Sequence, residues 1–382
     1  MRRMTFFYQQ EHGWSLDSFP DWDSPETLLM VFGASEFLQD PAPIQTLRDA
    51  FPNSLFIGCS TAGEIFSDRV LDHSLSVALI RFANTPLKRV SEAVNSMQES
   101  YDVGQRLARQ LAADDLRSLF VLSDGLHVNG SELVNGLCDA LPDEVVITGG
   151  LAGDGERFQQ SWVLSAGMPE ESKVVALGFY GDAVRVSFGS KGGWDIFGPE
   201  RRVTRSKGNV LYELDGKPAL ELYKEYLGEL SEGLPSTGLL FPLALRQNQE
   251  DERHRVRTIL AVDEEQQSLT FAGDVSEGWL AQLMRANFER LIDGAESAAK
   301  EAQQRSSSAK MGQKLCIAIS CVGRRLVLRE RSEEEVEVTL SALPGDVQQI
   351  GFYSYGEISP FVSGSCDLHN QTMTLTIFSE VE

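Results

Sequence analysis

The sequence predicts an α/β (α+β) protein with layered mixed β-sheets and flanking helices, built from duplicated strand–helix units. Short apolar runs rich in Val, Ile, Leu and Phe recur along the 382 residues and end at Gly or Asp, as buried strands do. Amphipathic helical patterns lie between these runs, and this alternation favours an α/β architecture. One strand–helix–strand–turn–strand unit also occurs twice, at a spacing of ninety residues.

The expected elements follow from local patterns. Strands are expected at residues 27–33, 54–58, 74–82, 118–123, 144–149, 173–181, 184–189 and 314–320, and two more within 256–274. Helices are expected after Asp102 and from Ser131 to Leu141, because apolar side chains recur there at helical spacing. The segment 277–305 is expected to be one long amphipathic helix. The acidic segment 331–337 is expected to be a solvated helix face.

The repeat relates residues 27–82 to residues 117–181. After a shift of ninety positions, Ala62-Gly63-Glu64 aligns with Ala152-Gly153-Asp154. A fainter third copy is expected near the C-terminus, where a strand again leads to Gly356-Glu357. Near residue 200 the strand–helix alternation gives way to a segment rich in turn-forming residues. This change suggests two domains, 1–200 and 201–382.

The charge and composition of the chain disfavour several kinds of binding partner. The net charge of -22, from 34 basic and 56 acidic residues, disfavours binding to nucleic acids and to anionic membranes. A basic partner would be attracted instead. Neither a secretory leader nor a run of about 20 apolar residues is evident. Five sparse cysteines fit reduced thiols, so a cytoplasmic location is expected.

The sequence offers little support for catalysis. It contains no Walker A loop, HExxH, CxxC pair or GxSxG elbow, so we expect a protein that is not an enzyme. A hydrolase or transferase that uses Cys59 or Ser60 as its nucleophile is the alternative. No Lys, Arg or His flanks Cys59 to stabilise a thiolate.

The Gly-acid turns are the candidate ligand sites. Each follows a strand, and ligands tend to lie at the carboxyl ends of strands in α/β sheets. A structural explanation is also open, because an acid after a strand commonly caps a turn. Duplication of such a capped turn would then place an acid at the same position in each copy. The candidate ligand-binding residues are Cys59, Ser60, Thr61, Gly63, Glu64, Gly150, Gly153, Asp154, Ser320, Cys321, Arg324, Tyr353, Tyr355 and Glu357.

Several motifs together resemble the FIST family of bacterial sensory modules. "IGCSTAGEI" and "TGGLAGDG" resemble the N-terminal FIST part, and "SCVGRRLVL", "GFYSYGEISP" and "LHNQTMTLT" resemble the C-terminal part. The resemblance runs from about residue 25 to the end and implies a two-part architecture. It also implies a sensor of a small-molecule ligand, for which amino acids have been proposed.

A chain of this size also resembles the NosP group of haem-binding nitric-oxide sensors. That resemblance implies haem b as cofactor, with no other metal, and a partner histidine kinase or cyclic-di-GMP enzyme. A homodimer is a possible assembly. A histidine would suit the iron, and His127 and His369 are the candidate axial ligands, with His254 as a third.

A sensor for an amino acid or another small polar metabolite is the other hypothesis. Glu64, Asp154 and Glu357 would then hold an ammonium group, while backbone amides and Arg324 would hold a carboxylate.

Overall fold

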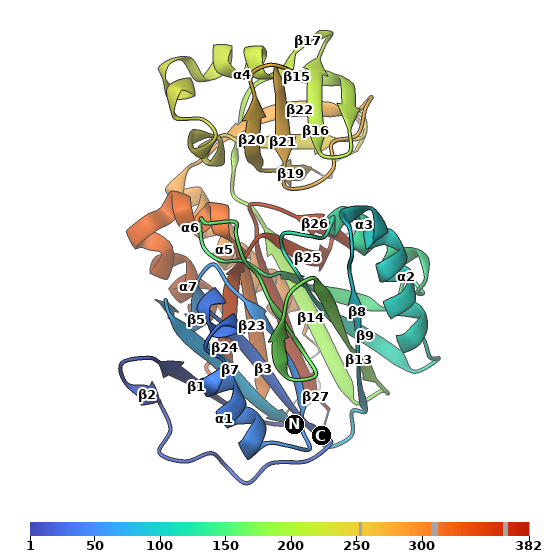
Figure 1. The fold of residues 1–382 in the computed structure, drawn as a ribbon, viewed down its shortest axis with the longest axis vertical. Helices are drawn as coiled ribbons and strands as arrows, with labels where there is room; N and C mark the ends of the chain where they lie inside the picture. The colour runs from blue at the N-terminus through green and yellow to red at the C-terminus, as the bar shows by residue number, and fades with distance from the viewer. Residues whose placement is uncertain (252–253, 307–311, 362–365, 382) are drawn as a thin grey trace.

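The chain forms a larger body of three sheets and a smaller unit that lies above it in Figure 1. The computed structural model describes residues 1–251, 254–306, 312–361 and 366–381. The predicted α/β (α+β) class with layered mixed sheets and flanking helices is confirmed. The predicted boundary at residue 200 falls inside β15 (Asp195–Lys207), the strand that enters the smaller unit.

The first sheet of the larger body has seven strands in the order β12-β11-β4-β3-β7-β1-β2. These strands are β1 (Arg2–Gln9), β2 (Gly13–Trp14), β3 (Thr27–Gly33), β4 (Leu55–Ser60), β7 (Ser74–Arg81), β11 (Val163–Ser165) and β12 (Met168–Glu170).

Two six-stranded sheets complete the larger body. One has the order β26-β25-β10-β9-β13-β8, and the other has the order β14-β27-β23-β24-β5-β6. Their strands are β5 (Glu64–Phe66), β6 (Arg69–Leu71), β8 (Leu87–Ala93), β9 (Leu116–Ser123), β10 (Val146–Leu151), β13 (Lys173–Tyr180), β14 (Val184–Lys191), β23 (Lys314–Cys321), β24 (Val347–Ser354), β25 (Gly356–Pro360), β26 (Cys366–His369) and β27 (Met373–Glu380).

Three copies of one strand pattern make up the larger body. In each copy two strands run parallel, and a third runs antiparallel beside the first of them: β4-β3-β7, β10-β9-β13 and β24-β23-β27. A residue one or two positions before the third strand has a positive φ in every copy, namely His73 (53°), Ser172 (53°) and Gln371 (61°). The repeat read from the sequence is therefore a structural repeat, and the fainter C-terminal copy is its third member.

The copies are joined by an exchange of strands. The strand after each Gly-acid turn leaves its own copy: β5 of the first copy pairs with β24 of the third. In the same way, β11 from the second copy pairs with β4, and β25 from the third copy pairs with β10. Each copy thus contributes one strand to the sheet of another copy, and this pairing joins the three copies into one body.

The inner faces of the three sheets meet in a central apolar core. Phe32 of the first copy packs on Phe352 of the third, with ring centroids 4.7 Å apart. Phe179 of the second copy stacks on Phe378 of the third at 4.9 Å. These aromatic contacts each add about 0.5–1.5 kcal/mol to the gain from burial.

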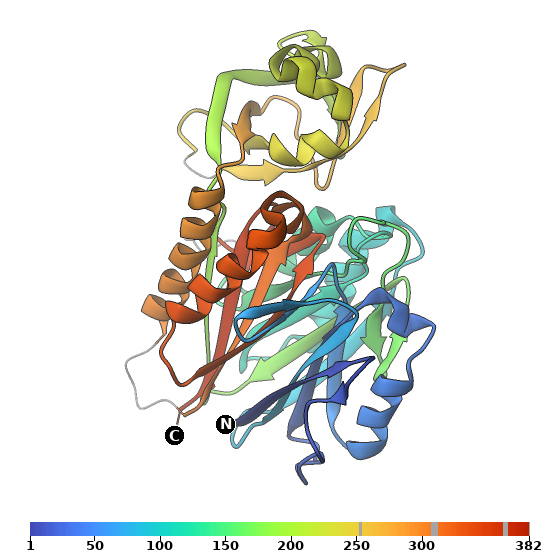
Figure 2. The ribbon, with the colours of Figure 1, turned by 90° about the vertical axis from the view of Figure 1, so that its left-hand side faces the viewer.

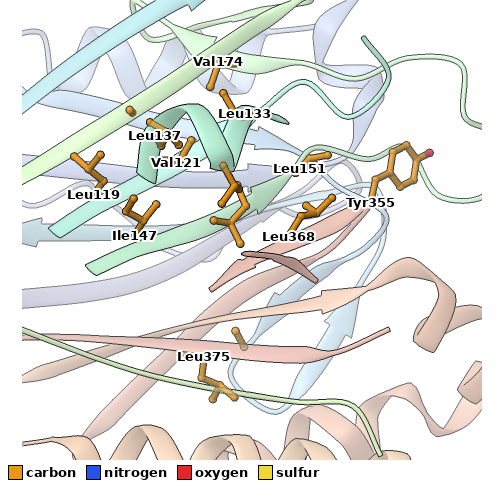
Figure 3. Close-up of a cluster of buried hydrophobic side chains, with 14 of the residues drawn as sticks. Leu119, Val121, Leu133, Leu137, Ile147, Leu151, Val174, Tyr355, Leu368 and Leu375 are labelled. Atoms are coloured by element: carbon orange, nitrogen blue, oxygen red, sulfur yellow. The ribbon is translucent and has the colours of Figure 1, made fainter. Parts of the chain in front are cut away.

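Helices cover the outer faces of the sheets. Leu137 of α3 and Leu107 of α2 pack over the second copy, where Figure 3 shows the cluster around Leu119, Val121 and Ile147. In the third copy α5 runs along the body, as Figure 2 shows. The helices are α1 (Ala42–Ala50), α2 (Ser100–Leu111), α3 (Gly130–Asp139), α4 (Ala219–Leu227), α5 (Phe288–Arg305), α6 (Val322–Leu328) and α7 (Ser332–Ser341).

The smaller unit lies between β14 and α5 in the chain and has its own apolar core. Its main strand order is β19-β18-β22-β15-β16-β21-β20, and β17 pairs with β16. Besides β15, its strands are β16 (Val210–Leu214), β17 (Lys217–Pro218), β18 (Leu243–Arg246), β19 (Arg255–Arg257), β20 (Ile259–Asp263), β21 (Ser268–Phe271) and β22 (Leu280–Arg285).

The prediction of one long helix over 277–305 is wrong at its N-terminal end. Residues 280–285 form β22, which pairs with β15 and β18, and α5 starts at Phe288. The Asn287 side chain caps α5 by accepting a hydrogen bond from the Arg290 backbone N–H at 3.3 Å. The apolar side chains of 280–284 fit either element, and sheet pairing decided between them.

Candidate functional site

The three acids of the Gly-acid turns are all buried, with exposed fractions of 0–1%. Glu64 lies at the start of β5, and its carboxylate accepts a hydrogen bond from the Thr61 hydroxyl. Its other oxygen accepts from the Ser74 N–H at 3.1 Å and the Ser74 hydroxyl at 2.7 Å. Glu64 therefore braces its own turn against the start of β7.

Glu357 of the third copy has the same arrangement. Its carboxylate accepts from the Ser354 hydroxyl at 2.7 Å and from the N–H and hydroxyl of Thr372 at 3.2 and 2.8 Å. Burial raises the pKa of both Glu64 and Glu357 to about 8, although the hydroxyl donors oppose this rise. These two acids hold loops together.

Asp154 of the second copy is bonded differently. Leu151 stands where the other copies have the hydroxyl residues Thr61 and Ser354, three positions before the acid. Lys173 stands where they have Ser74 and Thr372. The Asp154 carboxylate instead accepts from the Tyr355 hydroxyl of the third copy. It also accepts from the backbone N–H groups of Phe158, Gln159 and Gln160 at 2.8–3.0 Å. The acid thus folds residues 154–160 into a compact loop.

That loop forms one wall of an open polar cavity of about 590 Å³ at the carboxyl end of β3. We call it the polar cavity. Its lining residues are Ser35, Glu36, Gln39, His73, Asp154, Arg157, Gln159 and Gln160. Of the three turn acids, Asp154 lines this cavity, while Glu64 and Glu357 do not. The volume lies within the range of small-molecule sites.

Opposite charges face each other in the polar cavity. The Arg157 guanidinium is half exposed, donates to the Ser35 hydroxyl at 2.9 Å, and has its Nε 3.8 Å from an Asp154 carboxylate oxygen. Across the loop, Glu36 pairs with His73. The hydrogen bond that the His73 ring donates to the Glu36 carboxylate raises the pKa of His73, and the Glu36 charge adds to this rise. The cavity can therefore receive a small molecule that carries both an anionic and a cationic group.

The Cys59 segment is closed to solvent. Cys59 is fully buried, and burial raises the pKa of its thiol well above the usual range. The Ser60 hydroxyl, also buried, accepts the Trp162 N–H at 3.0 Å. Thr61 contacts the Gly63 N–H at 3.1 Å. A buried neutral thiol and an engaged hydroxyl give no support to the nucleophile alternative.

The predicted glycines serve close packing. A side chain at Gly63 (φ 131°) would meet the Arg325 guanidinium at 2.3 Å. Gly153 lies against the Tyr355 ring, and Gly150 lies beside Ile319 in the central region.

Arg324 is fully buried and pairs with Glu335 of α7, with Nε 2.6 Å from Oε1. Ser320 and Tyr353 donate to the other Glu335 oxygen, both at 3.1 Å. Cys321, also buried, follows on the same strand, and burial raises the pKa of its thiol. Arg324 is therefore engaged inside the third copy. The expectation that 331–337 is a solvated face is wrong for Glu335, which is the buried partner of this arginine.

The two candidate haem ligands differ in their surroundings. His369 is buried, its Nε2 lies 2.9 Å from the Ser359 carbonyl oxygen, and burial lowers its pKa. The His127 ring is half exposed, with Nδ1 3.1 Å from an Asp124 carboxylate oxygen. This carboxylate–histidine pair is a common support for a metal ligand. The polar cavity offers no apolar wall for a porphyrin, and neither histidine lines it.

Sequence reasoning found Asp154 but missed the other seven lining residues of the polar cavity, among them the charged or titratable Arg157, His73 and Glu36. Arg157 directly follows the "AGDGE" turn that was singled out, so its proximity could have been noticed. His73 and Glu36 lie far apart in sequence and meet only because β3 and β7 are paired. No local pattern marks such a pair.

Fold and site together define an α/β protein with a ligand-sized polar cavity at one edge of a sheet. The chain belongs to the FIST family: the FIST N domain model matches residues 27–217, and the FIST C domain model matches residues 219–360. FIST domains are sensory domains of signal transduction. None of the described helices is both long and apolar enough to cross a membrane.

Two further likenesses are distant. The chain is 25% identical over 351 residues to uncharacterized protein MJ1623 of Methanocaldococcus jannaschii, covering 81% of this chain and 65% of that protein's length. The chain thus spans just under two thirds of this relative. The solved structure of PurLQS from Thermotoga maritima covers 84% of this chain and 75% of its own, at 11% identity and a TM-score of 0.23. A score this low carries no argument about fold.

Proposed function

We propose that this chain is a sensor that binds a small zwitterionic metabolite, such as an amino acid, in the polar cavity. The observation that carries this proposal is the placement of Arg157 and Glu36 in the lining of one cavity. Arg157 would hold the carboxylate of the ligand, and Glu36 would hold its ammonium group. Hydrogen bonds to charged groups contribute about 1.5–3 kcal/mol each.

The loop 154–160 offers a route from binding to signalling. Arg157 lies in this loop, and the Asp154 carboxylate that folds the loop is also bonded to Tyr355 of the third copy. If the loop has two conformations, a ligand that binds one of them more tightly increases the population of that conformation. Tyr355 would carry that shift toward β25, the strand that follows it.

The test is a thermal-shift and calorimetric screen of the full chain against amino acids and related metabolites. Ligand binding to the folded state raises Tm by mass action. Arg157→Gln and Glu36→Gln are each expected to weaken binding at least about tenfold, or about 1.4 kcal/mol. Arg106→Gln, which alters an exposed arginine of α2 paired with Glu92, is the matched control. The absence of any binder, or equal binding by all variants, would contradict the proposal.

A second candidate function is haem-based nitric-oxide sensing at His127. Asp124 engages Nδ1 of the half-exposed His127 ring, so Nε2 is the nitrogen that would bind iron. Bound haem b would supply a site for a diatomic gas. Haem added to the purified chain should give a Soret band that His127→Ala removes and His369→Ala retains. A band unchanged by His127→Ala would exclude this residue as the ligand.

The proposed partner is a histidine kinase or a cyclic-di-GMP enzyme. A net charge of -22 favours a basic docking surface on that partner. We therefore expect the association to weaken as salt is raised, because screening shortens the range of charge attraction.

A further inference from the structure

Two cysteines from distant parts of the chain meet at the edge of the second copy. Cys138 lies in the last turn of α3, and Cys366 is the first residue of β26. α3 and β26 are in contact, and the Cys366 thiol is close enough to Cys138 to act on the pKa of its thiol. The Cys366 thiol also lies 3.4 Å from the Ile147 carbonyl oxygen. Both side chains are partly buried and pack against the same apolar cluster.

The other three cysteines differ from this pair. Cys59, Cys316 and Cys321 are 0–2% exposed, and burial raises the pKa of each thiol. In contrast, the hydrogen bond from Cys366 lowers the pKa of Cys138, while burial raises the pKa of Cys366. Cys138 is therefore the better nucleophile of the pair, because the thiolate is the reactive form.

We propose that Cys138 and Cys366 are a redox modification site, which closes to a disulfide when a peroxide oxidises it and reopens when a thiol reduces it. The Cys138 thiolate attacks one peroxide oxygen, the O–O bond breaks, and a sulfenic acid forms. The departing oxygen takes up the proton released from the thiol and leaves as water or an alcohol. The Cys366 thiol then attacks the sulfenic sulfur, the S–S bond forms, and a water leaves. Two thiols lose two electrons, and the peroxide gains them.

The position of this pair suggests what the disulfide would do. β26 also contacts the smaller unit, because Asp367 pairs with Arg255 and the Leu368 carbonyl accepts from Arg257 at 3.2 Å. Asn129, which caps α3, donates to Asp274 of the smaller unit at 3.1 Å. Figure 1 shows α3 and β26 at the end of the larger body that faces this unit. A bond between α3 and β26 would fix both elements on which the smaller unit is docked.

The test uses the full chain treated with hydrogen peroxide, then alkylated, digested and mapped by mass spectrometry. The expected product is a cross-linked peptide that contains Cys138 and Cys366, lighter by two hydrogens and restored by dithiothreitol. Cys59, Cys316 and Cys321 should be alkylated only after unfolding, which makes them internal controls. Amide exchange in α3 and β26 should slow in the oxidised protein.

Two variants separate the proposal from general oxidation. Cys138→Ser and Cys366→Ser should each abolish the cross-link, and Cys138→Ser should also lose labelling by a sulfenic-acid probe. A cross-link between other cysteines, or over-oxidation of Cys138 without any cross-link in the wild type, would overturn the proposal. The wild-type peptide map decides the matter even if a variant folds poorly.

Discussion

At the residue scale, small differences between the three copies decide which acid faces a cavity. In the first and third copies, hydroxyl residues hold the turn acid inside its own loop. In the second copy, Leu151 and Lys173 stand at those positions and cannot donate hydroxyl hydrogen bonds to Asp154. Asp154 instead collects backbone N–H groups of the next loop, and the wall of the polar cavity results.

The raised pKa of Glu64 predicts a pH dependence of stability. The folded pKa, about 8, lies above the ordinary value of 4.5, so between these values the folded state binds a proton that the unfolded state releases. This contribution to the free energy of unfolding is complete below 4.5 and is lost as pH rises toward 8, at up to about 1.4 kcal/mol per pH unit.

Glu64→Gln is expected to remove the Glu64 share of this dependence and to leave the share of Glu357, whose pKa is also about 8. Urea unfolding across that pH window should therefore show a flatter profile for the variant than for the wild type. Glu11→Gln, at an exposed acid, should keep the wild-type slope. If the free energy of unfolding had the same pH dependence in Glu64→Gln and in the wild type, ionisation of Glu64 would not destabilise the folded state, and the prediction would be wrong.

Removing Glu335 is expected to destabilise the third copy strongly. Arg324 would be left buried without its carboxylate, and breaking such a pair costs about 3–5 kcal/mol. Chemical unfolding of Glu335→Ala should show this loss. Glu337→Ala, at an exposed position of the same helix, should change stability by less than about 0.5 kcal/mol. Similar values for the two variants would mean that the buried pair is not stabilising.

At the element scale, the segment 277–305 shows how pairing overrides periodicity. Leu280, Leu283 and Met284 fit the apolar stripe of a helix. They nevertheless lie in β22, which pairs with β15 on one side and β18 on the other. The backbone hydrogen bonds of both neighbours are available to a strand and not to a helix. Asn287 then supplies the cap that starts α5.

Asn287→Ala is therefore expected to cost about 1 kcal/mol of stability, as the loss of a helix cap does. The hydrogen bond from the Asn287 side chain to Asp195 of β15, at 3.2 Å, would be lost as well. Thermal unfolding measures the effect, and Asn135→Ala on the exposed face of α3 is the control. Equal Tm values for the two variants would argue against a capping role.

At the scale of the whole molecule, the exchange of β5, β11 and β25 makes the three copies interdependent. Each sheet of the larger body contains a strand from another copy. The larger body should therefore unfold as one cooperative unit, whereas the smaller unit has a separate core.

Ile358→Ala tests this interdependence. Ile358 is buried in β25 of the third copy and pairs with Gly149 of the second, and its truncation is expected to cost about 2–5 kcal/mol. Hydrogen exchange should accelerate in β4, β10 and β24 together. Leu269→Ala, in the core of the smaller unit, should accelerate exchange mainly there. Faster exchange confined to β25 and β10 would contradict the cooperative unit.

The sequence by itself determined the fold class, most buried strands and the repeat, because these depend on short-range patterns of apolar and turn residues. It also located the Gly-acid turns, including Asp154 of the polar cavity. Only the tertiary structure decided that Glu64 and Glu357 brace loops, that Arg324 meets Glu335, and that His73 and Glu36 join Arg157 around a cavity. The physical reason is that such roles depend on which strands pair and which copies exchange strands, and these contacts join residues far apart in the chain.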